Sequence, residues 1–286
     1  MPGWKLIIHG GAKEIAPEQE ADNSLGLAAA IAEGRAVLDA GGSAVRAVEA
    51  SVRVLESLPV FNAGRGSEPT VHGNIEMCAA IMDGETLDVG GVMAIQEVLH
   101  PVSVARALLR EREILLAGPA AGRFAGSIEA ELCGVADLRT TDPAEAYEAA
   151  HDTVGAVAMD ADGHFAAATS TGGLAGQMQG RIGDSPMPGC GYYAENGVGA
   201  VALSGHGEGL ARLRMASRIM ERLNGGDPDM VVADCLSLMS RVGGDGGGIV
   251  IDAAGRFGWH HNSPHFAVAQ IAQGDTKASL WLKKPR

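Results

Sequence analysis

Hydroxyl side chains gather at two points of the chain that a β-hairpin would bring together. Two short apolar runs, Val154–Met159 and Phe165–Ala168, flank the sequence Asp-Ala-Asp-Gly, which is typical of a hairpin turn. Thr153 opens the first run, and Thr-Ser-Thr at 169–171 ends the second. Because hairpin strands are antiparallel, the pattern predicts three hydroxyls near Thr153. Thr is also an ordinary strand residue, so the pattern alone fits a structural role as well.

Further motifs accompany the hairpin in a fixed order. Besides the stretch 151–173, they are Ile-His-Gly-Gly-Ala at 8–12, Phe-Asn-Ala-Gly at 61–64 with Ile-Met-Asp-Gly at 81–84, Gly-Arg-Ile-Gly-Asp-Ser-Pro at 180–186, and Ser-Gly-His-Gly-Glu at 204–208. Together they resemble the plant-type asparaginase/isoaspartyl peptidase family of the Ntn hydrolases. The resemblance covers nearly the whole chain.

The resemblance implies that Thr153 becomes a nucleophile only after the chain is cut before it. The scissile bond is then Asp152–Thr153, and the products are 1–152 and 153–286. A Thr inside a chain has no obvious base nearby in this sequence, whereas an N-terminal Thr carries an α-amine with a pKa near roughly 8. The freed hydroxyl would attack the β-carbonyl of asparagine or of a β-aspartyl peptide. An acyl-enzyme would form, and water would release aspartate.

The resemblance also assigns the substrate contacts. Thr171 would orient the nucleophile and its amine by hydrogen bonding. Arg181 would bind the substrate α-carboxylate, which suits a bidentate guanidinium, and Asp184 would pair with the α-ammonium. Taken alone, Arg181 and Asp184 are three residues apart and also fit a surface ion pair that contributes little.

An oxyanion hole is implied at residues 204–207. The Gly205 N–H and the hydroxyl of Ser204 would form it, and Gly207 would shape the pocket. Family members usually carry Thr at position 204, so the methyl group that restricts the rotamer is missing here. The sequence departs from the family a second time at Cys78, where an Asp is usual.

A cation site is implied from the end of the second predicted helix through the motif at 61–64. The segment 55–65 resembles the family's sodium-binding loop, in which backbone carbonyls surround the ion. The corresponding residues are Leu55, Glu56, Leu58, Phe61, Ala63 and Arg65. An ordinary helix-to-strand connection remains the alternative. No cofactor is expected for catalysis.

Composition limits the classes of partner. Of 286 residues 46% are apolar, and the formal net charge is −13, which makes nucleic acid an unsuitable partner. We expect neither a signal peptide nor a transmembrane helix, and the four cysteines form no Cys-x-x-Cys pair. His260, His261 and His265 lack the spacing of a helical zinc site. These features predict a cytoplasmic protein that acts on a small molecule or dipeptide, and the resemblance implies a homodimer of cleaved protomers.

The apolar patterns predict strands and helices in blocks, which favours an α+β fold with packed sheets covered by helices. Besides the hairpin, the expected strands are Trp4–Ile8, Asn74–Met82, Leu87–Gln96, Val198–Leu203, Ile249–Asp252, Arg256–His260 and Phe266–Ile271. The expected helices are Ser24–Leu38, Ser43–Leu58, Pro101–Glu111, Ala120–Cys133, Gly207–Leu223 and Pro228–Arg241. Asp142–Glu145 resembles a helix start within the short linker Gly134–Asp152. The pattern fits the family's four-layer αββα sandwich in one domain.

Two other functions stay open. A glycosylasparaginase-like amidase is favoured by Asp, in place of Gly, before Thr153, but the motif at 8–12 and the expected lack of a signal peptide count against it. A non-processing relative that acts as a binding protein is favoured by Cys78, Ser204 and the short linker.

Overall fold

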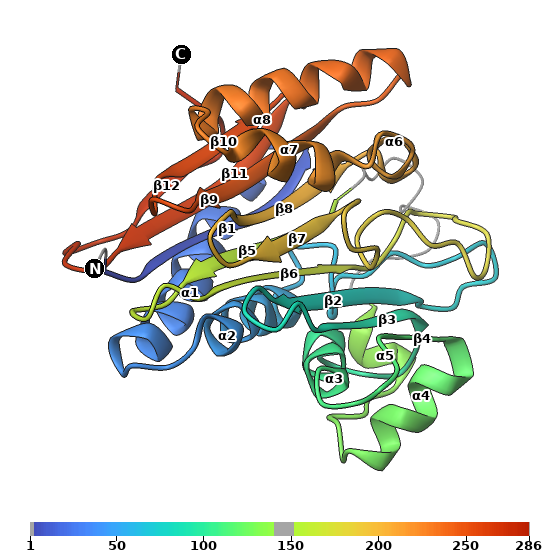
Figure 1. Cartoon of the computed structure of the whole chain (residues 1–286). Helices are drawn as coiled ribbons and strands as arrows, with labels where there is room; N and C mark the ends of the chain where they lie inside the picture. The colour runs from blue at the N-terminus through green and yellow to red at the C-terminus, as the bar shows by residue number, and fades with distance from the viewer. Residues whose placement is uncertain (1–2, 140–151, 286) are drawn as a thin grey trace.

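Two β-sheets form the centre of the protein (Figure 1). The computed structural model describes residues 3–139 and 152–285. Within these ranges the larger sheet has eight strands in the order β12-β11-β1-β5-β6-β2-β3-β4, and the smaller has four in the order β10-β9-β8-β7. The strands are β1 Lys5–Lys13, β2 Met77–Asp83, β3 Val89–Ile95, β4 Leu115–Ala117, β5 Val154–Met159, β6 Phe165–Thr171, β7 Tyr192–Glu195, β8 Gly199–Gly205, β9 Gly246–Asp252, β10 Phe257–His261, β11 His265–Ala272 and β12 Ser279–Trp281.

The helices pack on the outer faces of the two sheets (Figure 1). They are α1 Glu20–Asp39, α2 Ala44–Ser57, α3 Pro101–Leu108, α4 Gly118–Ser127, α5 Val135–Leu138, α6 Gly207–Leu213, α7 Met215–Leu223 and α8 Pro228–Ser237, with short 3-10 helices at Pro17–Gln19 and Leu238–Arg241. None of these helices is long and apolar enough to cross a membrane.

Alternation along the strands supplies three apolar cores. In β1, Leu6 and Ile8 pack against α1 and α2, whereas Ile7 faces the second sheet. In β8, Ala202 faces the first sheet and Val201 packs against α7 and α8. Since successive side chains point to opposite faces, strands covered on both sides must be apolar throughout. The predicted α+β class with two sheets and covering helices is confirmed.

The hairpin is formed as the sequence predicts. Strands β5 and β6 pair with Val154 opposite Ser170 and Met159 opposite Phe165. The turn is closed by Asp160, whose Oδ1 accepts the backbone N–H groups of Asp162 and His164, and Gly163 has a φ of 86°. Strand β6 ends at Thr171, so residues 169–171 form its last part within the sheet, as the pattern predicts.

The helices predicted at 120–133 and 207–223 differ most from the structure. The helix predicted at 120–133 ends at Ser127, and the chain turns at Glu129, which has a φ of 52°. The helix predicted at 207–223 is two helices, because Arg214 is left-handed with φ 49° and ψ 52°. There the N–H of Ser217 donates to Gly189 O at 2.9 Å, so a tertiary contact fixes the start of α7. The helix start predicted at 142–145 lies outside the described residues.

Candidate active site

Thr153 lies at the entry of β5, buried between the two sheets, with 5% of its surface exposed. Its Oγ1 lies 3.0 Å from Oγ of Ser185, and its N–H donates to Oγ of Ser204 at 3.1 Å. Since Val154 pairs with Ser170, the residue before it faces the end of β6, as the hairpin pattern predicts.

The carbonyl oxygen of Asp152 accepts two hydrogen bonds. The hydroxyl of Thr171 donates to it at 3.0 Å and the side-chain amide of Asn62 at 3.4 Å. Asn62 is itself held by Gly173 O at 2.7 Å, and Thr171 Oγ1 accepts the N–H of Gly173 at 3.1 Å. Two oriented donors therefore polarise the bond that precedes Thr153, in the arrangement that stabilises a developing oxyanion.

The three hydroxyls of the segment 169–171 do not all approach Thr153. Thr171 does so through Asp152, and Thr169 donates to the carbonyl of Ser185 at 2.7 Å. The hydroxyl of Ser170 donates instead to Oε1 of Glu56 at 2.7 Å. The prediction for Ser170 is wrong, because alternate residues of a strand face opposite sides of the sheet.

Ser204 and Gly205 end β8 next to the Thr153 backbone. The hydroxyl oxygen of Ser204 accepts the N–H groups of Thr153 and Ala12, at 3.1 and 3.0 Å, and these two donors fix its position without a methyl group. Gly205 has a φ of 140°, and a Cβ there would lie 2.4 Å from Asp245 O, so a side chain cannot fit.

Arg181 and Asp184 lie together but do not pair directly in the described structure. Arg181 instead donates from Nε and Nη2 to both carboxylate oxygens of Glu208, each at 2.9 Å. A Cβ on Gly207 would lie 2.9 Å from Asp184 Oδ1 and 3.0 Å from Arg181 Nη2, so a bare backbone separates the two charges. The alternative of a simple Arg181–Asp184 surface pair is wrong.

Asp184 is a buried carboxyl with an unused oxygen. It is 3% exposed, and its Oδ2 has no hydrogen-bond partner among the described residues. Burial raises the pKa of Asp184 to about 7, although Arg181 acts in the opposite direction. A cationic group bound here would supply the missing partner.

Comparison with known proteins places the chain in a family. A family model described as asparaginase matches residues 2–146 and 134–280. The chain belongs to the asparaginase family. Its similar relatives include proteins named isoaspartyl peptidase/L-asparaginase from Danio rerio (37% identity, covering 96% of this chain and 94% of the relative), Xenopus laevis (40%, 87% and 86%) and Homo sapiens (36%, 93% and 92%). The family resemblance seen in the sequence is confirmed, and the chain is a hydrolase of this family.

Four residues of this hydrolase reach the site without having been predicted as site residues: His9, Lys13, Asn62 and Ser185. His9, Asn62 and Ser185 lie inside the motifs at 8–12, 61–64 and 180–186, and that membership was the available signal. The His9 ring is fully buried, and burial lowers its pKa to about 3 despite an opposing interaction with the Thr153 backbone. His9 is therefore neutral at physiological pH.

Cys78, the residue that departs from the family pattern, pairs with Thr171 across β2 and β6. Its Sγ accepts the N–H of Ala94 at 3.4 Å, and burial raises the pKa of its thiol to about 11. Cys78 is thus a neutral packing residue beside the site.

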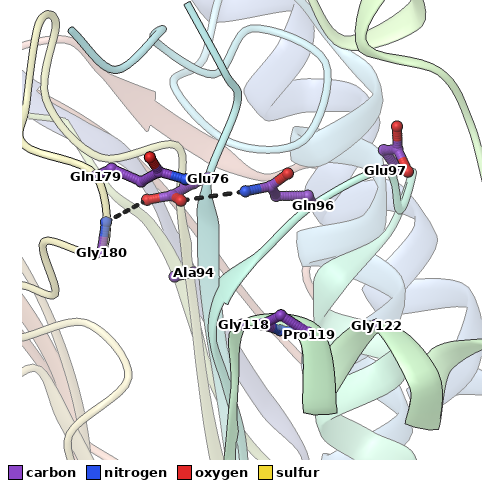
Figure 2. A pocket seen from close by; sticks show the side chains of 9 residues that line it. All are labelled: Glu76, Ala94, Gln96, Glu97, Gly118, Pro119, Gly122, Gln179 and Gly180. Atoms are coloured by element: carbon purple, nitrogen blue, oxygen red, sulfur yellow. Dashed lines mark hydrogen bonds between the residues drawn. The ribbon is translucent and has the colours of Figure 1, made fainter. Parts of the chain in front are cut away.

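A cavity of about 500 Å³ lies at the base of the loop that carries Arg181. Figure 2 shows the carboxylate of Glu76 between Gly180 and Gln96. Glu76 accepts the N–H of Gly180 at 2.6 Å and the amide of Gln96 at 3.1 Å. None of the predicted catalytic residues lines this cavity. The cavity bears on the site only through Glu76, which holds Gly180, the residue next to Arg181.

The segment 55–65 curls tightly, with Gly64 at a φ of 53°, and Gly66 directly after it has a φ of 154°. The carbonyls of Glu56 and Phe61 accept N–H groups of the same segment at 2.7 and 2.9 Å. Each carbonyl oxygen keeps a second lone pair, and oxygen ligands of this kind suit a hard cation. The six predicted residues thus lie in one curled segment; among the described residues there is no cluster of three or more His, Cys, Asp or Glu suited to a metal.

Proposed function

We propose that this chain is an autoprocessing N-terminal-threonine amidohydrolase that cleaves L-asparagine and β-aspartyl peptides to L-aspartate. The observation that carries the proposal is the pair of donors, from Thr171 and Asn62, on the carbonyl oxygen of Asp152. The names of the relatives support the substrate class.

Maturation would begin at the Asp152–Thr153 bond. The Thr153 oxygen attacks the Asp152 carbonyl carbon, the C–N bond breaks, and the hydroxyl proton passes to the departing amine. Water then hydrolyses the resulting ester: its oxygen enters the new α-carboxylate of Asp152, and the Thr153 hydroxyl is restored. The donors from Thr171 and Asn62 stabilise the oxyanion of the first step.

Catalysis would use the same hydroxyl with the freed amine of Thr153 as base. Arg181 binds the substrate α-carboxylate, and Asp184 offers its unpartnered oxygen to the α-ammonium. The Gly205 N–H and the Ser204 hydroxyl face the substrate oxyanion. Ammonia or an amine leaves with a proton, and water releases aspartate from Thr153.

Thr171→Val should slow self-cleavage by about 10²–10³-fold, because it removes one donor from the developing oxyanion while keeping the side-chain shape. Intact mass against time measures the rate. Ser170→Ala is the matched control, since that hydroxyl faces Glu56 on the other side of the same strand. Cleavage of Thr171→Val at the wild-type rate would contradict the assigned role.

Asp184→Asn should raise thermal stability at pH 8 more than at pH 5, while it weakens substrate binding. Because the folded-state pKa of Asp184 is raised to about 7, the folded protein holds this proton more tightly than the unfolded chain does. The contribution of this group to stability therefore falls as pH rises from about 4 to 7. Melting temperatures of wild type and variant at both pH values test this, with the exposed Asp39→Asn as control. An equal difference at both pH values would argue against it.

The activity is tested by aspartate release from asparagine, β-aspartyl-leucine and a glycosylasparagine. The proposal expects the first two to be hydrolysed faster. The Asp152–Thr153 junction favours a glycosylasparaginase-like amidase, and preferential hydrolysis of the glycosylasparagine would make that the function. Hydrolysis of none by a folded chain would favour a binding protein.

The finer architecture is part of the same proposal. The three cores support a four-layer αββα Ntn-hydrolase sandwich in one domain, cut into 1–152 and 153–286. The curled segment 55–65 supports a structural sodium ion held by its carbonyls. The proposal also includes a homodimer of cleaved protomers in the cytoplasm, which rests on the family resemblance. The net charge of −13 supports the absence of nucleic-acid partners, and no membrane partner is proposed.

A further inference from the structure

Lys13 is a largely buried cation at the site to which the proposed chemistry assigns no role. It ends β1, and its Nζ lies 2.6 Å from Oδ2 of Asp152. Their side chains are 13% and 2% exposed. The same ammonium donates to Val60 O at 2.9 Å, so it is held in place from a second side.

The carboxylate of Asp152 also lies directly over the bare backbone of Gly11. A Cβ on Gly11 would lie 1.1 Å from Asp152 Oδ1, and Gly11 has a φ of 111°, which favours glycine. The space can therefore hold the Asp152 carboxylate only because residue 11 has no side chain. We call this space, bounded by Gly11 and Lys13 and filled by the Asp152 carboxylate, the Lys13 subsite.

The proposed cleavage changes the charge balance there. Asp152 becomes a chain end with two carboxylates where it had one, beside a single ammonium. Glu68 also interacts electrostatically with both Lys13 and Asp152, and burial raises its pKa. Repulsion among these carboxylates favours departure of the Asp152 end, which leaves the Lys13 subsite open next to the new amine of Thr153.

Two cations, Arg181 and Lys13, would then lie near Thr153 on different sides. The hydroxyl of Thr153 leads through Ser185 to Asp184 and the Arg181 clamp. The backbone of Thr153 leads through Asp152 to Lys13. In the proposed function, Arg181 and Asp184 bind the aspartyl part of the substrate. The side of Thr153 that faces Lys13 is then free for the leaving group.

We propose that the Lys13 subsite binds a carboxylate on the leaving group and so favours β-aspartyl dipeptides over free asparagine. The inference rests on the proposed amidohydrolase function. A β-aspartyl dipeptide carries two carboxylates, one on the aspartyl part and one on the departing amino acid. Asparagine has only the first and releases ammonia, so Lys13 distinguishes the two substrates.

The test compares kcat/KM for β-aspartyl-alanine, β-aspartyl-alaninamide and asparagine on fully cleaved protein. The amide lacks only the second carboxylate. Wild type should prefer the dipeptide acid over its amide by about 10–100-fold, the usual range for a charge-assisted hydrogen bond. Lys13→Met should remove most of this preference. The exposed Lys277→Met is the matched control and should keep it.

Lys13→Met leaves the Asp152 carboxylate without its cation and can impair folding or cleavage. The double variant Lys13→Met/Asp152→Gly removes both charges, and Asp152→Gly alone is its reference. Equal kcat/KM for acid and amide in wild type, or the same loss on both in the Lys13 variants, would overturn the inference while the amidohydrolase function stands. Absence of hydrolysis of all three substrates by wild type would overturn the function and the inference together.

Discussion

Thr153→Ala is expected to give a chain that never cleaves itself and has no amidohydrolase activity. The substitution removes the only atom proposed to attack both the Asp152 carbonyl and the substrate, so both reactions should fall by about 10⁴-fold or more. Intact mass would show one uncut chain, and aspartate release would stay at background. The fold should persist, because the hydrogen bond from the Thr153 N–H to Ser204 and the pairing of β5 with β6 do not need the Thr153 side chain.

Thr153→Ser is the informative control. It keeps the hydroxyl and, after cleavage, the amine, but loses the methyl that restricts the rotamer. We expect slower cleavage and reduced but measurable activity. Wild-type activity in Thr153→Ala would remove Thr153 from the mechanism.

Arg181→Ala should raise KM by about 10²–10³-fold and leave the rate of self-cleavage close to that of wild type. The guanidinium binds the Glu208 carboxylate in a bidentate geometry, which shows that it can hold a carboxylate, and its loss removes charge-assisted hydrogen bonds to the substrate. It makes no described contact with the Asp152–Thr153 bond. Steady-state kinetics and the cleavage time course on the same preparation test both halves of the prediction.

Glu208→Gln is the matched variant on the other side of this ion pair. It keeps the size of the side chain but removes the charge that competes with the substrate carboxylate, so it should lower KM or leave it unchanged. If Arg181→Ala damages self-cleavage as strongly as substrate turnover, a substrate-binding role for Arg181 is untenable.

Local periodicity was sufficient to predict the hairpin and the position of Thr171. The two-residue alternation of β6 was also contained in the sequence, and it directs Ser170 to Glu56 while its neighbours face the site. The prediction that Ser170 lies near Thr153 failed, because three adjacent hydroxyls were treated as one group although they lie on two faces of the strand.

Contacts between distant segments could not be predicted. Lys13 reaches Asp152 across most of the first half of the chain, and Asn62 binds Gly173 across 111 positions. The interruption of the helix at Arg214 has no adjacent Gly or Pro that would predict it. It depends on the contact of Ser217 with Gly189. The effect of Cys78 likewise required its burial and the N–H of Ala94 to be known.

Intact mass of the purified wild-type protein, followed over several days at neutral pH, tests the central claim most directly. The account predicts two products, 1–152 and 153–286, that accumulate together as the full chain disappears. A folded chain that stays uncut would contradict it, because Thr153 would then never acquire the amine proposed as its base.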